Sequence, residues 1–271
     1  MNTVVAELSR ETAGWKYLDV QVRHLKSGQT HTLNSPDRES AIVLVDGAVE
    51  LTTDTLDVRV SRDSVFSAAV DVLYAPPSTT VTVRAHKDSE FAVGSAPASG
   101  RYPARLISTA EMSSVLRGGG PACRQVVSDL ADPLPAESLI VYEAWVPRGG
   151  WAGWPPHRHD GYEGSPYLEE TYYYRFDRDN GFGYHRNVTP EKGLDESTPI
   201  RDRSLVAVPS GYHMCAAGPA ANMWILNFLA GTRDDRKLLP HFDPAETWIN
   251  DDWSAGLLQL PAVRTQHPPR R

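Results

Sequence analysis

The stretch PPHRHDGYEGSPYLEETYYYRF, residues 155–176, carries an HxH pair, two adjacent glutamates and an aromatic run typical of a β-strand. On an extended strand, side chains two residues apart share a face, so His157 and His159 can point the same way. Glu169 and Glu170 directly precede the aromatic run. The stretch therefore predicts a β-strand fold with imidazoles and a carboxylate brought together.

Strand alternation selects between the two glutamates. It places Glu170, Tyr172 and Tyr174 on one face and turns Glu169 to the other. Two interpretations of the tyrosines stay open, because they suit either a pocket lined by hydroxyl groups or an aromatic core with polar tips. We expect Glu170 rather than Glu169 to join the histidines.

A further histidine follows in VAVPSGYHM, residues 206–214. Imidazole and carboxylate together suit a divalent transition metal such as Zn, Mn or Fe, and an incomplete ligand shell leaves positions for substrate oxygens. Cys215 could share a face with His213, but a free cysteine is more often a small buried residue. The predicted metal ligands are His157, His159, Glu170 and His213.

A second cluster of polar residues lies in GFGYHRNV, residues 181–188. An arginine lining the pocket would bind a substrate carboxylate with two parallel hydrogen bonds, and Arg186 is our candidate for this role. A surface ion pair is the alternative for Arg186. His185, Tyr172 and Tyr174 are the candidate catalytic residues that could move a proton.

Short segments with strand character recur along the whole chain and are separated by turns rich in Pro and Gly. Many short strands of this kind predict an all-β sandwich or barrel. The predicted strands include residues 41–47, 51–60, 80–85, 90–96, 138–146, 171–176, 181–188, 204–209 and 223–231.

The chain shows a weak internal repeat. YAPPSTTV, residues 74–81, is similar to VAVPSGYH, and this match places Val81 where His213 stands, while Glu39 corresponds to Glu170. We place a boundary within residues 97–125. The predicted domains are residues 1–105, which lack a complete metal site, and residues 106–271, which carry it.

Composition excludes several classes of function. The chain has 271 residues and a formal net charge of −7, and it lacks the basic stripe of a nucleic-acid-binding protein. The chain has no run of about eighteen apolar residues, so we expect no membrane span, and the first residues do not resemble a secretory signal. Two cysteines do not form a disulfide framework, so we expect a cytoplasmic protein.

The motifs together resemble a known family. PPHRHD, SPYLEETYYYRF, VAVPSGYHM, LNFLAG and HFDPAETWI, with DRESAIVLVDG and DVLYAPPSTTVTV in the first half, are similar to the bacterial 5-deoxy-glucuronate isomerases of myo-inositol catabolism. This resemblance covers nearly the whole chain. It implies a bicupin, with two tandem jelly-roll-like cupin β-barrels, and a metal at His157, His159, Glu170 and His213.

The resemblance also implies an activity, the aldose–ketose isomerisation of 5-deoxy-D-glucuronate to 5-dehydro-2-deoxy-D-gluconate. The chain departs from the family near the expected pocket, where GWAGWPP precedes the HxH pair, His185 replaces a Gln and Met214-Cys215 replaces Pro-Val. Two alternatives remain, a non-haem iron dioxygenase and a non-catalytic sugar-binding bicupin. We further expect a uronate-type small molecule as the partner, neither nucleic acid nor membrane, and a possible homo-oligomer.

Overall fold

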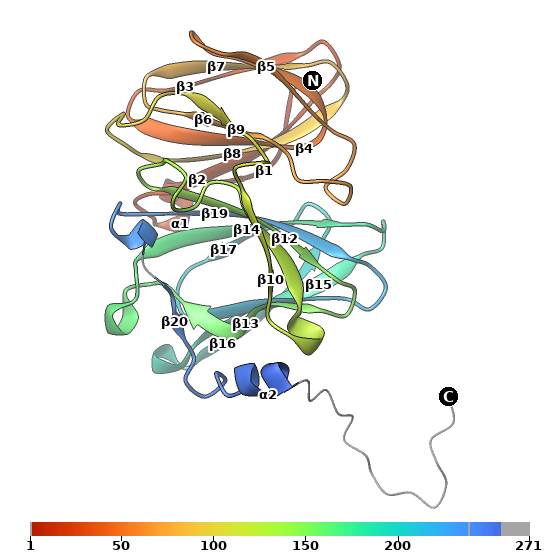
Figure 1. Cartoon of the computed structure of the whole chain (residues 1–271), viewed down its shortest axis with the longest axis vertical. Helices are drawn as coiled ribbons and strands as arrows, with labels where there is room; N and C mark the ends of the chain where they lie inside the picture. The colour runs from red at the N-terminus through yellow and green to blue at the C-terminus, as the bar shows by residue number, and fades with distance from the viewer. Residues whose placement is uncertain (1, 238, 256–271) are drawn as a thin grey trace, which may run out of the picture.

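The computed structural model describes residues 2–237 and 239–255, and β-strands form most of it. Figure 1 shows two stacked groups of strands, the first half of the chain above the second. The prediction of an all-β chain is confirmed. Within the described residues, no helix combines the length and the apolar character needed to cross a membrane.

The first group is a nine-stranded sheet that curls back on itself. Its main path runs β1-β2-β8-β4-β6-β9, and β3, β5 and β7 join through pairing with β4 and with one another. Its elements are β1 (Thr3–Leu8), α1 (Arg10–Ala13), β2 (Asp19–Leu25), β3 (Thr30–Ser35), β4 (Arg38–Thr52), β5 (Asp57–Arg62), β6 (Val72–Ala75), β7 (Thr79–Ala85), β8 (Ser89–Pro97) and β9 (Arg105–Ile107).

Strand β4 is longer than the sequence predicts, because the Asp46-Gly47 pair produces a bend and not a turn. The pairing of β4 with β8 shifts by one residue between Leu44 and Asp46, and Gly47 has a φ of +101°, which favours glycine. Beyond this bulge, β4 pairs with β5 and β7. The predicted strand at 51–60 is interrupted by a turn, in which the Thr53 hydroxyl accepts a hydrogen bond from the Leu56 N–H.

The second group consists of a six-stranded and a five-stranded sheet, with strand orders β10-β11-β12-β19-β14-β17 and β16-β15-β18-β13-β20. Its elements are β10 (Ser113–Arg117), η1 (Gly120–Ala122), β11 (Arg124–Ser128), β12 (Leu139–Val146), β13 (Trp151–Arg158), η2 (Tyr162–Gly164), β14 (Leu168–Phe176), β15 (Phe182–Thr189), η3 (Pro190–Lys192), β16 (Leu194–Arg201), β17 (Leu205–Val208), β18 (Tyr212–Ala217), β19 (Met223–Gly231), η4 (Asp235–Lys237), β20 (His241–Phe242) and α2 (Ile249–Ala255).

The strands β14 and β19 of the six-stranded sheet are buried on both faces, which explains their aromatic and apolar runs. Tyr173 and Trp224 pack into the core cluster of the first group. Their neighbours Tyr174 and Ile225 pack into the interior of the second group. Alternating side chains thus serve two cores, and both strands carry large apolar or aromatic residues on both faces.

Two buried glutamates join the groups in a reciprocal way. Glu39 of β4 accepts hydrogen bonds from the backbone N–H groups of residues 137–139, the turn that leads into β12. Glu169 of β14 accepts hydrogen bonds from the N–H groups of residues 16–18, the turn that leads into β2. Each half therefore holds a turn of the other half through one carboxylate.

This reciprocity corrects one part of the internal repeat. Glu39 lies opposite Ala96 in its sheet, and Glu169 lies opposite Ala230, so geometry matches Glu39 with Glu169 and not with Glu170. The alignment of the two halves was shifted by one residue, because Glu39 and Glu170 each precede a run of strand-forming residues. Ser40 is then the counterpart of Glu170.

The same comparison shows why the described residues of the first half hold no equivalent set of ligands. His157 pairs with His213 across β13 and β18, whereas Leu33 pairs with Val81 across β3 and β7. Over the described parts of the chain, three-residue groups suited to a metal occur once, in the second half. The division after residue 105 stays a prediction, and β9, which spans it, pairs with β6.

The junction between the halves also contains a buried, unpaired carboxyl group, which leads to a stability prediction. Asp129 is 0% exposed, and neither of its oxygens has a hydrogen-bond partner among the residues described. Burial, followed by the negative charge of Glu143, raises the pKa of Asp129 well above its usual range. The native state therefore keeps a proton that the unfolded chain releases above about pH 4.

We expect Asp129→Asn to increase the free energy of unfolding by at least about 1 kcal/mol at neutral pH, because the amide cannot ionise. Below the pKa of Asp129 in the unfolded chain, the carboxyl group is protonated in both states and its contribution to stability is complete. As the pH rises from there toward the higher pKa of the native state, this contribution is lost. The difference between the two proteins should therefore shrink toward about pH 4. Urea denaturation across this range measures it, and a difference independent of pH would contradict the assignment.

Candidate metal centre

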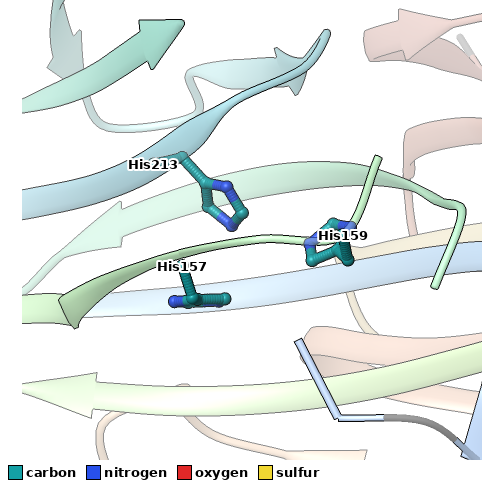
Figure 2. Close-up of side chains that lie close together, drawn as sticks. All are labelled: His157, His159 and His213. Atoms are coloured by element: carbon teal, nitrogen blue, oxygen red, sulfur yellow. The ribbon is translucent and has the colours of Figure 1, made fainter. Parts of the chain in front are cut away.

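Three imidazoles converge in the interior of the second group. His157 lies at the end of β13, His159 directly follows this strand, and His213 lies on the adjacent β18. The ligand atoms of the three side chains all lie within 4.8 Å of one another, and Figure 2 shows the rings facing a common space. Cross-strand pairing of His157 with His213 produces this arrangement, because paired residues in a ladder project to the same side.

The carboxylate comes from the facing sheet. Glu170 of β14 places its Oε2 atom 2.9 Å from Nε2 of His159 and 3.0 Å from Nε2 of His213. Its Oε1 atom accepts a hydrogen bond from Nδ2 of Asn227 at 2.9 Å. As strand alternation predicts, Glu169 points the other way, toward the first half.

The hydrogen bonds of the imidazoles test whether these residues fit a metal. Nδ1 of His159 lies 2.8 Å from the carbonyl oxygen of Leu168, which can only accept, so Nδ1 carries the proton. In the neutral ring, the lone pair on Nε2 then faces the lone pairs of Glu170. Nε2 of His213 is buried and has no hydrogen bond within the described structure, although the Glu170 oxygen is close.

A proton or a metal ion between these atoms would remove the repulsion between their lone pairs. The donor set of neutral imidazoles and one carboxylate fits a divalent transition metal, and the backbone carbonyl that fixes the ring of His159 is a common orienting partner of a metal ligand. Burial, followed by the neighbouring imidazoles, lowers the pKa of His157 well below its usual range. Burial raises the pKa of Glu170, but the adjacent imidazoles of His159 and His213 outweigh burial and hold that pKa low.

Asp160 fixes the turn before His213. Its carboxylate accepts hydrogen bonds from the Arg158 guanidinium and from the N–H of Gly211 at 2.8 Å. Burial opposes ionisation, but the Arg158 hydrogen bond and the Gly211 N–H lower the pKa of Asp160 to about 2. Asp160 therefore acts on the backbone, not on an imidazole.

Of the three candidate catalytic residues, only Tyr172 lines the cavity next to the histidines. The hydroxyl of Tyr174 is 2.7 Å from Nδ1 of His185, and Nε2 of His185 is 2.9 Å from Oδ1 of Asn187. Since an amide oxygen only accepts, Nε2 carries the proton and Tyr174 donates to Nδ1. Burial lowers the pKa of His185 to about 4, so this chain of groups forms a neutral wall behind Tyr172.

Cys215 is not among the grouped ligands. Its side chain is 1% exposed, and burial raises the pKa of its thiol to about 12. The side chain remains a protonated thiol packed in the core cluster with Tyr174. This agrees with the interpretation of Cys215 as a small buried residue.

The structure places Arg186 on the outer face of β15, away from the cavity. Its guanidinium forms hydrogen bonds to both carboxylate oxygens of Asp195, at 2.7 and 2.6 Å, and its side chain is 41% exposed. Alternation explains this, because His185 faces inward and its neighbour must face outward. The placement gives no support to the substrate-binding role predicted for Arg186.

Three other arginines line the cavity instead, and the sequence interpretation missed them. The cavity has a volume of about 160 Å³, roughly ten times what one water needs. One available signal was the loop RGGGPACR, since residues that flank a hairpin loop meet across the ladder. The cavity is lined by Arg117, Arg124, Val126, Ile140, Tyr142, Ala144, Ala152, Gly153, His157, His159, Pro166, Leu168, Glu170, Tyr172, Ile225, Asn227, Leu229, Arg236 and Pro240.

Comparison with known proteins places this geometry in context. The model of a protein family described as "KduI/IolB family" matches residues 1–249 of the chain. The chain is 34% identical over 255 residues to the 5-deoxy-glucuronate isomerase of Geobacillus kaustophilus (strain HTA426), covering 90% of each protein. It is 31% identical over 252 residues to the 5-deoxy-glucuronate isomerase of Bacillus subtilis (strain 168), covering 91% of this chain and 92% of that protein.

Solved structures agree with the fold. An IolB-like protein from Salmonella typhimurium LT2 superposes with a TM-score of 0.88 at 37% identity, covering 92% of this chain and 96% of that one. An oxalate decarboxylase superposes with a TM-score of 0.63 at 11% identity, covering 87% of this chain and 74% of that one. The second likeness concerns the fold alone, and the predicted bicupin architecture is confirmed.

Proposed function

Because the chain belongs to the KduI/IolB family, we propose that it is a 5-deoxy-glucuronate isomerase, the name carried by its relatives. The reaction converts the aldose 5-deoxy-D-glucuronate into the ketose 5-dehydro-2-deoxy-D-gluconate in inositol catabolism. The observation that carries this proposal is the convergence of His157, His159, His213 and Glu170, of which all but His213 line the cavity.

These four residues would hold one divalent transition metal, either Zn, Mn or Fe. When bound, such an ion supplies a Lewis acid that favours negative charge on the carbonyl and hydroxyl oxygens of a sugar. His159 and His213 are held by the carbonyl oxygens of Leu168 and Gly211, at 2.8 and 3.3 Å. The protein thus fixes the orientation of both rings beside Glu170.

The isomerisation moves two protons and no net electrons. The proton on C2 of the aldose moves to C1, and the hydroxyl proton on O2 moves to O1. Tyr172 is the candidate whose side chain lines the cavity, and we assign it the proton transfer at its hydroxyl oxygen. Tyr174 and His185 stand behind it and are positioning residues.

We expect Tyr172→Phe to lower kcat by about 10²–10⁴-fold, with a small change in KM, because the change removes a group that moves a proton. Tyr174→Phe is the matched control, since its hydroxyl donates to His185 and is fully buried. It should lower kcat by less than about tenfold. Equal losses in both variants would show that Tyr172 has no special role.

The proposed activity is tested by incubating the purified wild-type protein with 5-deoxy-D-glucuronate, with and without oxygen, and following both sugars by NMR. Conversion at equal rates in both atmospheres supports the isomerase. Conversion that requires and consumes oxygen would instead indicate an iron dioxygenase. Binding of the uronate without turnover by metal-loaded protein would indicate a sugar-binding bicupin.

Three further assignments complete the proposal. The first domain is a sister barrel that supports the second and carries no metal of its own. The protein acts on a small sugar acid in the cytoplasm and associates into a homo-oligomer. Size-exclusion chromatography with light scattering measures the oligomeric state.

A further inference from the structure

Two arginines face each other at the cavity without an acidic partner. Arg117 of β10 lies directly opposite Arg124 of β11 in the antiparallel ladder. Like charges in opposite positions of a ladder destabilise it. Within the described residues, no carboxylate lies within ion-pair distance of either guanidinium.

Other arginines of the protein have partners within the chain. Buried Arg38, Arg62 and Arg158 each pair with a carboxylate, and exposed Arg186 pairs with Asp195. Arg236 also lines the cavity but donates to the backbone carbonyl oxygens of residues 130, 134 and 139. Of the three arginines that line the cavity, exposed Arg117 and half-buried Arg124 therefore have neither an ion pair within the described residues nor the three backbone acceptors of Arg236.

The contacts of the pair position it and leave donors available. Nη1 of Arg124 donates to the carbonyl oxygens of Ala122 and Trp154, both at 3.1 Å. Nε and Nη2 of Arg124 donate to no group within the part of the chain that is described. The guanidinium of Arg117 stacks on the ring of Tyr142, 5.7 Å from its centre.

A neighbouring cavity supports the same position for the ligand. Arg117, Arg124 and His157 line both the metal-site cavity and a second cavity, which Trp253 of α2 helps to enclose. The two arginines therefore lie where the two cavities meet, beside one of the predicted metal ligands. An anion held there would have its other end directed at the histidines.

We propose that the Arg117–Arg124 pair binds the carboxylate of the sugar acid and selects uronates over neutral sugars. This inference rests on the proposed function, since it names the second anchor of the same substrate. The planar guanidinium matches a carboxylate with two parallel hydrogen bonds, and the uncompensated charge attracts an anion into the cavity.

The test compares 5-deoxy-D-glucuronate with neutral 5-deoxy-D-glucose, which has a hydroxymethyl group in place of the carboxylate. In Arg124→Gln, KM for the uronate should rise about 10- to 100-fold, because a hydrogen bond to a charged group is lost. The kcat/KM for the neutral sugar should stay within about threefold of wild type, which also controls for folding. Arg117→Gln should act in the same direction.

Arg186→Gln is the matched control, because it removes an arginine from an adjacent face without touching the cavity. It should leave both substrates unaffected. Arg124→Lys keeps the charge but loses the planar fork, so its KM for the uronate should fall between wild type and Arg124→Gln. An unchanged ratio of kcat/KM for the two sugars in Arg124→Gln would overturn the inference.

Failure of the inference differs from failure of the proposed function. If wild-type protein converts the uronate but Arg124→Gln does so with the same KM, only the inference fails. If wild-type protein converts neither sugar, the proposed function fails. The Arg117–Arg124 pair is then tested by measuring how much the uronate increases the Tm of each protein. Loss of that increase in Arg124→Gln but not in Arg186→Gln supports the pair, and its retention contradicts it.

Discussion

Replacing His213 by Ala is expected to abolish both metal retention and isomerase activity. His213 is 0% exposed, its Nε2 atom lies 3.0 Å from Glu170, and this nitrogen makes no hydrogen bond within the described structure. Without it, His159 and Glu170 can share a single proton at 2.9 Å, which satisfies both groups without a metal. The carboxylate would then cease to be a ligand.

We expect kcat/KM to fall by about 10³-fold or more, since Lewis-acid stabilisation of charge supplies several kcal/mol. Metal content, measured by elemental analysis of untagged protein, should drop in parallel. His86→Ala is the control, because His86 is a surface histidine that contacts Glu50 in the first half. His157→Ala should behave like His213→Ala. A His213→Ala protein that keeps its metal and full activity would refute the metal centre.

Replacing Glu39 by Gln is expected to cause the largest loss of stability. Glu39 is 0% exposed and accepts hydrogen bonds from three consecutive backbone N–H groups and from the Tyr74 hydroxyl at 2.8 Å. A glutamine presents an NH2 group where an acceptor is needed. In either orientation the NH2 group faces a backbone N–H donor, that of residue 137 or those of residues 138 and 139, so the turn is held less firmly.

The free energy of unfolding should fall by about 3–5 kcal/mol, because two of the hydrogen bonds to the buried carboxylate are lost and each contributes about 1.5–3 kcal/mol. Urea denaturation measures this change. Glu7→Gln is the matched control on an exposed strand, and it should stay within about 0.5 kcal/mol of wild type. Glu169→Gln, which disrupts the reciprocal contact, should resemble Glu39→Gln. If Glu39→Gln were as stable as Glu7→Gln, the contact would not hold the halves together.

The strand pattern was readable from the sequence where a strand has a simple environment. The run at residues 223–231 corresponds to β19, and the aromatic run at 171–176 lies within β14, because both strands pack against a core on each face. The Asp46-Gly47 pair misled the prediction of β4. A hairpin turn and a bulge need the same left-handed residue, and only the pairing partners distinguish them.

The site was readable in part for a similar reason. Alternation correctly separated Glu169 from Glu170, because one strand governs both. Arg186 was selected for its chemistry and its closeness in sequence to His185, yet that closeness forces it outward. Arg124 comes from the facing sheet, and no local pattern reports which strands of two sheets meet across a cavity. Long-range packing decides this, so single-sequence reasoning does not reach it.

The adjacency of Glu169 and Glu170 has a consequence for how this chain can change over generations. One carboxylate secures a turn of the first half, and the next reaches the three imidazoles. Insertion or deletion of a single residue upstream in β14 would exchange their directions and damage both sites in one event. Insertions and deletions should therefore be tolerated in the loop before this strand but selected against within it. The contact between the halves and the metal site then depend on the same strand length.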